Sequence, residues 1–128
     1  MTLMVVDGDT GRVVAARLRL ALNPWTRLRG LIGTPPLEPD EGLLIRPCNG
    51  VHTFFVARPL DLVYLARDGR VEALVAGLRP WRIGPLLAGV RAVLELREGR
   101  IRESGVEEGH VLHLVRAVRG GPRPGRGV

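Results

Sequence analysis

Apolar and polar residues alternate along several short stretches of this chain, which is the pattern of β-strands with one buried face. In residues 14–22 every second position is valine, alanine or leucine, and arginines stand between them. In residues 90–97 the same alternation places Arg91, Glu95 and Arg97 on the polar side. Both stretches are therefore predicted to be strands that bury one face and leave the other to solvent.

Two turn signals rich in aspartate and glycine separate apolar runs and predict β-hairpins. The first is DGDTG at residues 7–11, which stands between a short apolar run and the alternating stretch 12–22. The second is Asp68-Gly69, in the middle of residues 60–78. Further short strands are predicted at residues 43–47 and 110–118.

At residues 23–33 the spacing of apolar residues changes from every second position to every third or fourth, which predicts one short helix. Asn23 suits the cap, Pro24 suits the first position, and apolar residues from Trp25 onward recur at helical spacing up to a stop at Gly33. A second helical turn fits residues 98–106, whereas the proline-rich stretches 34–42 and 79–89 are predicted to be loops.

Six or so strands with one or two short helices predict a mainly-β fold, a sandwich or a barrel. Residues 1–118 are predicted to form a single domain. The remaining residues 119–128, RGGPRPGRGV, lack the apolar side chains needed for ordering and are predicted to be a flexible tail.

Composition narrows the class of protein. The 128 residues contain no apolar run near the roughly 20 residues that cross a bilayer, and the first residues lack the features of a signal peptide, so a cytoplasmic protein without membrane association is expected. A single cysteine can form no intramolecular disulfide. The net charge is +6, but all the basic residues are arginines, which are dispersed and interleaved with acids. This pattern does not favour nucleic acid as a partner.

The segment PCNGVHTFF, residues 47–55, gathers the only cysteine and a histidine with polar and aromatic neighbours. Cys48 and His52 would meet on a helix but lie about 13 Å apart on a strand, and the residues between them favour a turn, so their distance stays open. They are candidates for a catalytic thiolate and imidazole pair. The alternative is an inert, buried thiol.

The same segment and the loops near it supply candidates for a ligand pocket, because apolar pockets with a few convergent polar groups are typical binding sites. The predicted pocket is framed by Cys48, His52, Thr53, Phe55, Asp61, Trp81 and Arg82. Each has a structural alternative: Asp61 can be a buried acid paired with an arginine, and Trp81 can be a lid anchored on the core.

Common catalytic and cofactor signatures are absent from the sequence. It contains no phosphate-binding glycine loop, dinucleotide fingerprint, GxSxG elbow or paired-histidine zinc helix. One cysteine and three scattered histidines show no zinc-ligand spacing. No cofactor and no metal are therefore expected.

Several blocks in order resemble the DUF192 family of small uncharacterised proteins, also called UPF0127. These blocks are RLRGLIG at 27–33, EGLLIRPCNGVHTFF at 41–55, PLDLVYLARDGRV at 59–71, and then LRPWR, AVLEL and GVEEGHVLHL. The resemblance implies a mainly-β, sandwich-like domain with a short helix, and it implies no reaction. The chain departs from the family pattern at Val56, where methionine is common, and at His110, where aspartate is usual. We interpret His110 as a turn residue.

These observations lead to one hypothesis and two alternatives. The protein is predicted to be a small-ligand, peptide- or sugar-binding accessory module with a pocket near PCNGVHTFF. The first alternative is a small hydrolase- or transferase-like enzyme that uses Cys48 and His52. The second is weak, arginine-driven binding to nucleic acid. The sequence does not indicate an oligomeric state.

Overall fold

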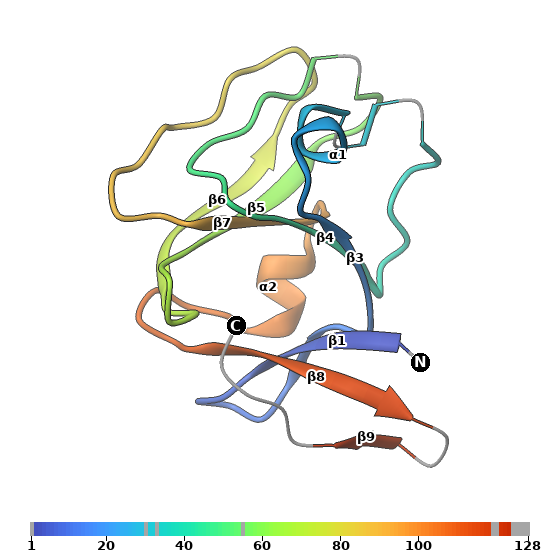
Figure 1. Cartoon of the computed structure of the whole chain (residues 1–128), viewed down its shortest axis with the longest axis vertical. Coiled ribbons are helices and arrows are strands. Elements are labelled where there is room, and N and C mark those ends of the chain that lie inside the picture. The colour runs from blue at the N-terminus through green and yellow to red at the C-terminus, as the bar shows by residue number, and fades with distance from the viewer. Residues whose placement is uncertain (1, 30, 33, 55, 119–120, 124–128) are drawn as a thin grey trace.

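The strands of the protein form two sheets (Figure 1). The structure is a computed structural model, and it describes residues 2–29, 31–32, 34–54, 56–118 and 121–123. The four-stranded sheet has the order β2-β1-β8-β9, made of Val13–Ala15, Thr2–Asp7, Leu112–Val118 and Gly121–Arg123. The five-stranded sheet has the order β3-β4-β7-β5-β6, made of Arg17–Ala21, Glu41–Ile45, Ala92–Arg97, Leu60–Leu65 and Val71–Leu78. The predicted mainly-β, sandwich-like fold is confirmed.

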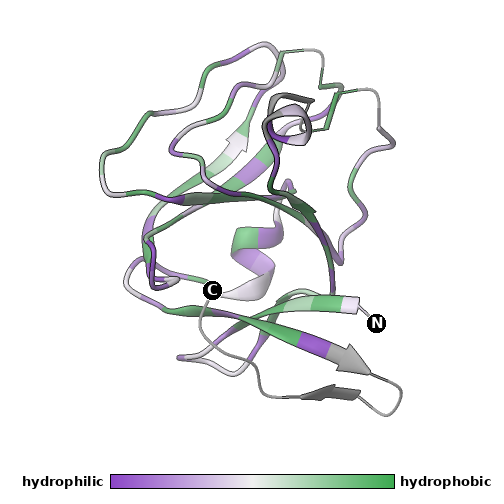
Figure 2. Cartoon of the chain, viewed as in Figure 1, coloured by the Kyte–Doolittle hydropathy of each residue, from purple (hydrophilic) through white to green (hydrophobic). Residues whose placement is uncertain are grey.

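The two sheets enclose the first of two hydrophobic cores, with helix α2 (Arg100–Ser104) between them (Figure 1). Leu44, Val63 and Leu94 from the larger sheet are fully buried there with Val5 and Leu112 from the smaller sheet. Figure 2 shows the hydrophobic residues running along the strands, and the hydrophilic ones gathered more on turns and connections. Burial of this inner face explains the period-two pattern of the strands.

The opposite, outer face of the five-stranded sheet is also covered. Helix α1 (Pro24–Arg29) and the long connections between strands lie over it (Figure 1). A second core of buried side chains forms beneath them, including Leu43, Leu62, Tyr64 and Val93. The central strands β5 and β7 are thus buried on both faces, which favours a nearly continuous run of apolar residues.

The alternating stretch 14–22 belongs to both sheets, which the sequence did not predict. Strand β2 ends at Ala15 in the smaller sheet, and β3 begins at Arg17 in the larger one. Because the chain changes sheet at this point, the predicted buried face is not continuous. Leu20 and Leu22 are 38% and 45% exposed, so their predicted burial is wrong.

The predicted helix and hairpins are present. The Asn23 side chain accepts a hydrogen bond of 2.8 Å from the backbone N–H of Thr26, as expected of a cap. Helix α1 leaves Trp25 74% exposed, so this residue is not part of its buried face, and the predicted stop at Gly33 lies outside the described residues. The hairpins β1–β2 and β5–β6 and the helical turn α2 form where they were predicted.

The end of the chain contains one described element beyond the predicted domain. Residues 121–123 are strand β9, which pairs with β8. Residues 119–120 and 124–128 lie outside the described residues, so the flexible tail stays a prediction. Among the described helices, none is long and apolar enough to cross a membrane.

Candidate functional site

The described residues of the segment 46–59, which contains PCNGVHTFF, lie over the outer face of the five-stranded sheet and are hydrogen-bonded to the segment 79–91. The backbone N–H of Cys48 donates to Arg91 over 2.9 Å, and that of Gly84 donates to Val51 over 2.8 Å. The Tyr64 hydroxyl of the sheet donates to the carbonyl of Pro85. The two segments therefore form one backbone-bonded layer that is anchored to the sheet.

Cys48 and His52 line the same cavity, and neither is the other's hydrogen-bond partner. The Cys48 thiol donates to the carbonyl of Gly50 over 2.9 Å, and the His52 ring accepts from the backbone N–H of Phe54. Burial raises the pKa of the Cys48 thiol above its ordinary value, and Glu95 raises it further. This is the opposite of the lowered pKa that a nucleophilic cysteine requires.

Thr53, Trp81 and Arg82 form a structural clip. The buried Thr53 hydroxyl donates to the carbonyl of Arg79 and accepts from the backbone N–H of Arg82. The exposed ring of Trp81 contacts the half-buried ring of Phe54, with 5.8 Å between their centroids and a tilt of 31° between their planes. None of these four side chains lines the cavity that holds Cys48 and His52. Phe55 lies outside the described residues.

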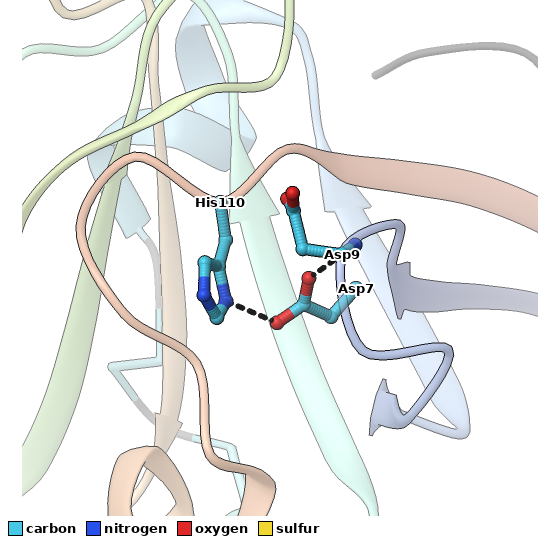
Figure 3. A group of neighbouring side chains, drawn as sticks. All are labelled: Asp7, Asp9 and His110. Atoms are coloured by element: carbon cyan, nitrogen blue, oxygen red, sulfur yellow. Dashed lines mark hydrogen bonds and ion pairs between the residues drawn. The ribbon is translucent and has the colours of Figure 1, made fainter.

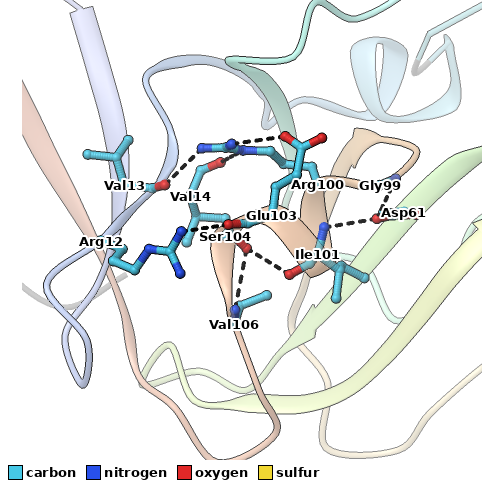
Figure 4. Close-up of polar contacts among 10 residues, drawn as sticks. All are labelled: Arg12, Val13, Val14, Asp61, Gly99, Arg100, Ile101, Glu103, Ser104 and Val106. Carbon is cyan, nitrogen blue, oxygen red and sulfur yellow. Dashed lines mark hydrogen bonds and ion pairs between the residues drawn. The ribbon is translucent and has the colours of Figure 1, made fainter.

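Asp61 lies on the other side of the sheet, so it does not line this cavity. Its side chain points toward α2 (Figure 4), where it accepts hydrogen bonds from the backbone N–H groups of Gly77, Gly99 and Ile101. These amides take the place of the expected arginine partner. Asp61 shares its face of β5 with Val63 because side chains alternate along a strand.

Helix α2 is held in place by further contacts of the same region (Figure 4). The guanidinium of Arg100 donates to the carbonyls of Val13 and Val14, and Arg12 donates to the carbonyl of Glu103. The polar groups around Asp61 are thus engaged in joining α2 to β2 and β5. We interpret them as structural.

A cavity of about 130 Å³ lies beneath the segment 48–52, and we call it the Glu95 cavity. It is lined by Arg27, Leu31, Ile32, Ile45, Cys48, Gly50, Val51, His52, Val56 and Glu95. Glu95 stands in the central strand β7, in register with Leu43 on one side and Leu62 on the other. A carboxyl group thus forms part of the wall of an otherwise largely apolar cavity.

The environment of Glu95 makes its ionisation costly. Its residue exposure is only 4%, and this burial raises the pKa of the carboxyl to about 7. Arg19 lowers this pKa in part, since β3, β4 and β7 place Arg19, Leu43 and Glu95 in one row across the sheet. Among the described residues the ion pair of Arg19 is with Glu41, whose Oε2 lies 3.9 Å from Arg19 Nε, so Arg19 acts on Glu95 only at longer range.

Two side chains of the cavity wall carry buried polar atoms without hydrogen-bond partners among the described residues. One is the acceptor Oε2 of Glu95, and the other is the donor Nε of Arg27. Arg27 also donates from its terminal nitrogen to the carbonyl of Pro47, which holds the guanidinium near the segment. Unpaired buried polar atoms are rare in folded proteins, so this pair marks the cavity as a candidate binding site.

Sequence reasoning missed both Glu95 and Arg27. Glu95 was assigned to a solvent-facing side of its strand, and this assignment is wrong because a layer of loops covers that side. One signal was available: Val93 has the same parity as Glu95, which is unusual for a fully exposed face. Arg27 was noted only as part of a family motif.

A second polar cluster lies where the β1–β2 turn meets the start of β8 (Figure 3). Asp7 accepts from the ring of His110 over 2.7 Å and from the backbone N–H of Asp9, and Asp9 accepts from the backbone N–H of Val111. The ligand-type atoms of Asp7, Asp9 and His110 lie within 4.8 Å of one another, a spacing that can hold a cation. Their mutual bonds already account for a structural clasp. The bond to Asp7 raises the pKa of His110.

Fold and cavity together define a class: a small, two-sheet β protein with a buried carboxyl beneath a layer of loops. The sequence profile of the DUF192 family, described as an uncharacterised ACR, matches residues 5–114. The chain belongs to this family, as its motifs predicted. A UPF0127 protein from Thermococcus sibiricus is 27% identical over 113 residues, which cover 83% of this chain and 71% of the relative.

Two solved structures share the fold. A protein of unknown function from Novosphingobium aromaticivorans has a TM-score of 0.75 and 23% identity, covering 87% of this chain and 82% of its own. A proposed transcription regulator from Sinorhizobium meliloti has a TM-score of 0.71 and 26% identity, covering 87% and 90%. The latter description concerns that protein and assigns no partner to this chain.

Proposed function

We propose that the protein is a binding module that holds a hydroxyl or amide group of a small ligand in the Glu95 cavity. The observation that carries this proposal is the partnerless Oε2 of Glu95, a buried acceptor in the wall of a cavity. Burying a carboxyl without hydrogen bonds costs several kcal/mol in typical cases. A ligand that supplies the missing bond recovers part of that cost.

The second partnerless atom narrows the chemistry of the bound group. Glu95 offers an acceptor, and Arg27 offers an N–H donor in the same wall. A hydroxyl or an amide can donate to the first and accept from the second, whereas a simple cation or anion satisfies only one of them. Sugars and peptides both carry such groups, in agreement with the ligand classes expected from the sequence.

The size of the cavity indicates that it holds one group of the ligand. A water molecule occupies roughly 30 Å³ in the liquid, so a cavity of about 130 Å³ accommodates a few heavy atoms. Typical pockets for whole drug-sized ligands are larger, roughly 300–1,000 Å³. His52 is exposed and lines the cavity, so the remainder of a ligand can leave the protein beside it.

No observation favours the enzyme alternative over binding. The Cys48 thiol is engaged with Gly50, and its pKa is raised. The His52 ring accepts from the backbone N–H of Phe54, and none of the described carboxylates bonds to this ring, although a general base of this type usually requires such a partner. The partnerless atoms in the cavity wall belong to Glu95 and Arg27, so the features of the cavity favour recognition.

Fragment titration followed by NMR tests the proposal. N-methylacetamide and propanol are titrated into the wild type, Glu95→Leu and the matched control Glu72→Leu, which removes an exposed carboxylate on β6. We expect saturable shifts of the Gly50 and Val51 amides in the wild type and the control, and their loss in Glu95→Leu. Equal shifts in Glu95→Leu, or none in the wild type, would refute the proposal.

A further inference from the structure

A second cavity lies on the outer face of the five-stranded sheet, and we call it the Arg97 cavity. Its volume is about 250 Å³, and its walls are mostly apolar, including Leu37 and Leu60. Two arginines, Arg58 and Arg97, also line it. The binding proposal above makes no use of this cavity.

The two cavities adjoin one another. Leu31 and Val56 line both, so these two side chains form a shared wall. Glu95 and Arg97 stand two residues apart on β7 and share one face of the strand, which places their backbones about 7 Å apart. Strand β7 therefore contributes an acidic residue to the first cavity and an arginine to the second.

The charge of the second cavity complements an anion. Arg58 and Arg97 are exposed, and neither has an ion-pair or hydrogen-bond partner among the described residues. A guanidinium group can bind a carboxylate through two parallel N–H···O hydrogen bonds, one to each carboxylate oxygen. An apolar cavity with such a rim suits a molecule that ends in a carboxylate.

The volumes favour one ligand for both cavities. Each cavity is smaller than the roughly 300 Å³ at which ligand pockets begin, whereas the two together exceed it. A chain of methylene groups can pass along Leu31 and Val56, where it would remove apolar surface from water. Each buried methylene is worth about fourfold in affinity.

We propose that the ligand spans both cavities: a short aliphatic carboxylic acid with a hydroxyl group at its far end. The hydroxyl is held by Glu95 and Arg27, the methylenes contact Leu31 and Val56, and the carboxylate pairs with Arg97 and Arg58. The hydroxyl half rests on the function proposed above. The carboxylate half does not.

Three matched series of probes test this proposal on the whole 128-residue chain. They are 1-alkanols, alkanoates and ω-hydroxyalkanoates, each with carbon chains from the butyl to the octyl length. Affinities are measured by calorimetry and by NMR. At the best chain length we expect the hydroxy acid to bind at least about fivefold more tightly than the alkanoate, because its hydroxyl adds hydrogen bonds to Glu95 and Arg27. We also expect it to bind about fivefold more tightly than the alkanol, an advantage that decreases with salt.

Variants assign each end of the ligand to its cavity. Arg97→Ala combined with Arg58→Ala should remove the advantage of the carboxylate, and Glu95→Leu should remove that of the hydroxyl. Arg70→Ala is the matched control, because it removes an exposed arginine at the other end of β5, about 20 Å away. Circular dichroism verifies folding, and Glu95→Gln serves as a second, more conservative variant of the buried position.

The outcomes separate the two proposals. If alkanols bind in a Glu95-dependent way and hydroxyalkanoates bind no more tightly than they do, the spanning ligand is overturned and the proposed function remains in place. Arg97-dependent binding of alkanoates without any effect of Glu95 overturns both the hydroxyl site and the spanning ligand. Absence of binding throughout the series at millimolar concentration also overturns both. A loss in Arg70→Ala equal to that in the cavity variants shows general charge attraction and overturns the assignment of the carboxylate end.

Discussion

The buried carboxyl of Glu95 should make the stability of the protein depend on pH. Its pKa is raised by burial from 4.5 to about 7. Below pH 4.5 the group is protonated in the folded and the unfolded protein alike. Between 4.5 and about 7 the folded protein keeps a proton that the unfolded chain releases, so each increase in pH in this window favours unfolding.

The magnitude follows from the size of this window. Each pH unit between the two pKa values changes the free energy of unfolding by about 1.4 kcal/mol. The wild type should therefore lose about 3 kcal/mol between pH 4.5 and pH 8 through this one group. Glu95→Gln keeps the shape of the side chain and removes the titration. The change in the free energy of unfolding from pH 4.5 to pH 8 should therefore be about 3 kcal/mol more favourable for Glu95→Gln than for the wild type.

Urea unfolding followed by far-ultraviolet circular dichroism at a series of pH values measures this difference. Fluorescence is a weaker probe, because Trp25 and Trp81 are both exposed in the folded protein. His110 titrates in a neighbouring window, but it is present in both proteins and cancels in their difference. Parallel pH profiles for the wild type and Glu95→Gln would show that the carboxyl is not held in an apolar environment, and would refute the reasoning.

Three further predictions concern other residues. Asp61→Asn should lower the free energy of unfolding by about 3 kcal/mol, because the amide NH2 group of asparagine then faces backbone N–H groups. The same substitution should leave fragment binding on the opposite face of the sheet unchanged. Urea unfolding measures the first effect and the NMR titration measures the second. The pKa of His110 is raised by its bond to Asp7, so this contribution to stability is complete below pH 6.5 and is lost as the pH rises through the higher value of the folded protein. His110→Gln in the Glu95→Gln background should flatten the remaining pH dependence above 6.5; an unchanged slope contradicts this assignment. The Cys48 thiol, with its raised pKa, should react with iodoacetamide more slowly than free cysteine at pH 8, and a faster reaction would favour the enzyme alternative.

Local signals were sufficient for the predicted turns and helix start. The Asp68-Gly69 turn and the Asn23 cap depend on contacts between residues a few positions apart, so the neighbouring sequence is enough to predict them. The alternation of apolar residues likewise identified most strands. The family resemblance then agreed with a fold that these patterns already favoured.

Features that depend on distant segments could not be predicted in the same way. Glu95 is buried because Leu31 and residues 48–52 lie over its strand, and period-two alternation does not tell whether a polar face will be covered. The sequence places Asp61 on a buried face of its strand but does not indicate which side of the sheet that face belongs to, and the structure places it opposite the cavity. Its backbone partners near α2 come from more than ten residues away.

The passage of one extended segment from β2 to β3 has a consequence for the way the protein comes apart. Only Ala16 separates the two strands, so the edge of one sheet is covalently continuous with the edge of the other. Neither sheet can detach and leave its partner's edge strand undisturbed. Amide hydrogens deep in both sheets should consequently exchange with solvent through one shared opening, with a common free energy, and the two layers should behave as a single cooperative unit.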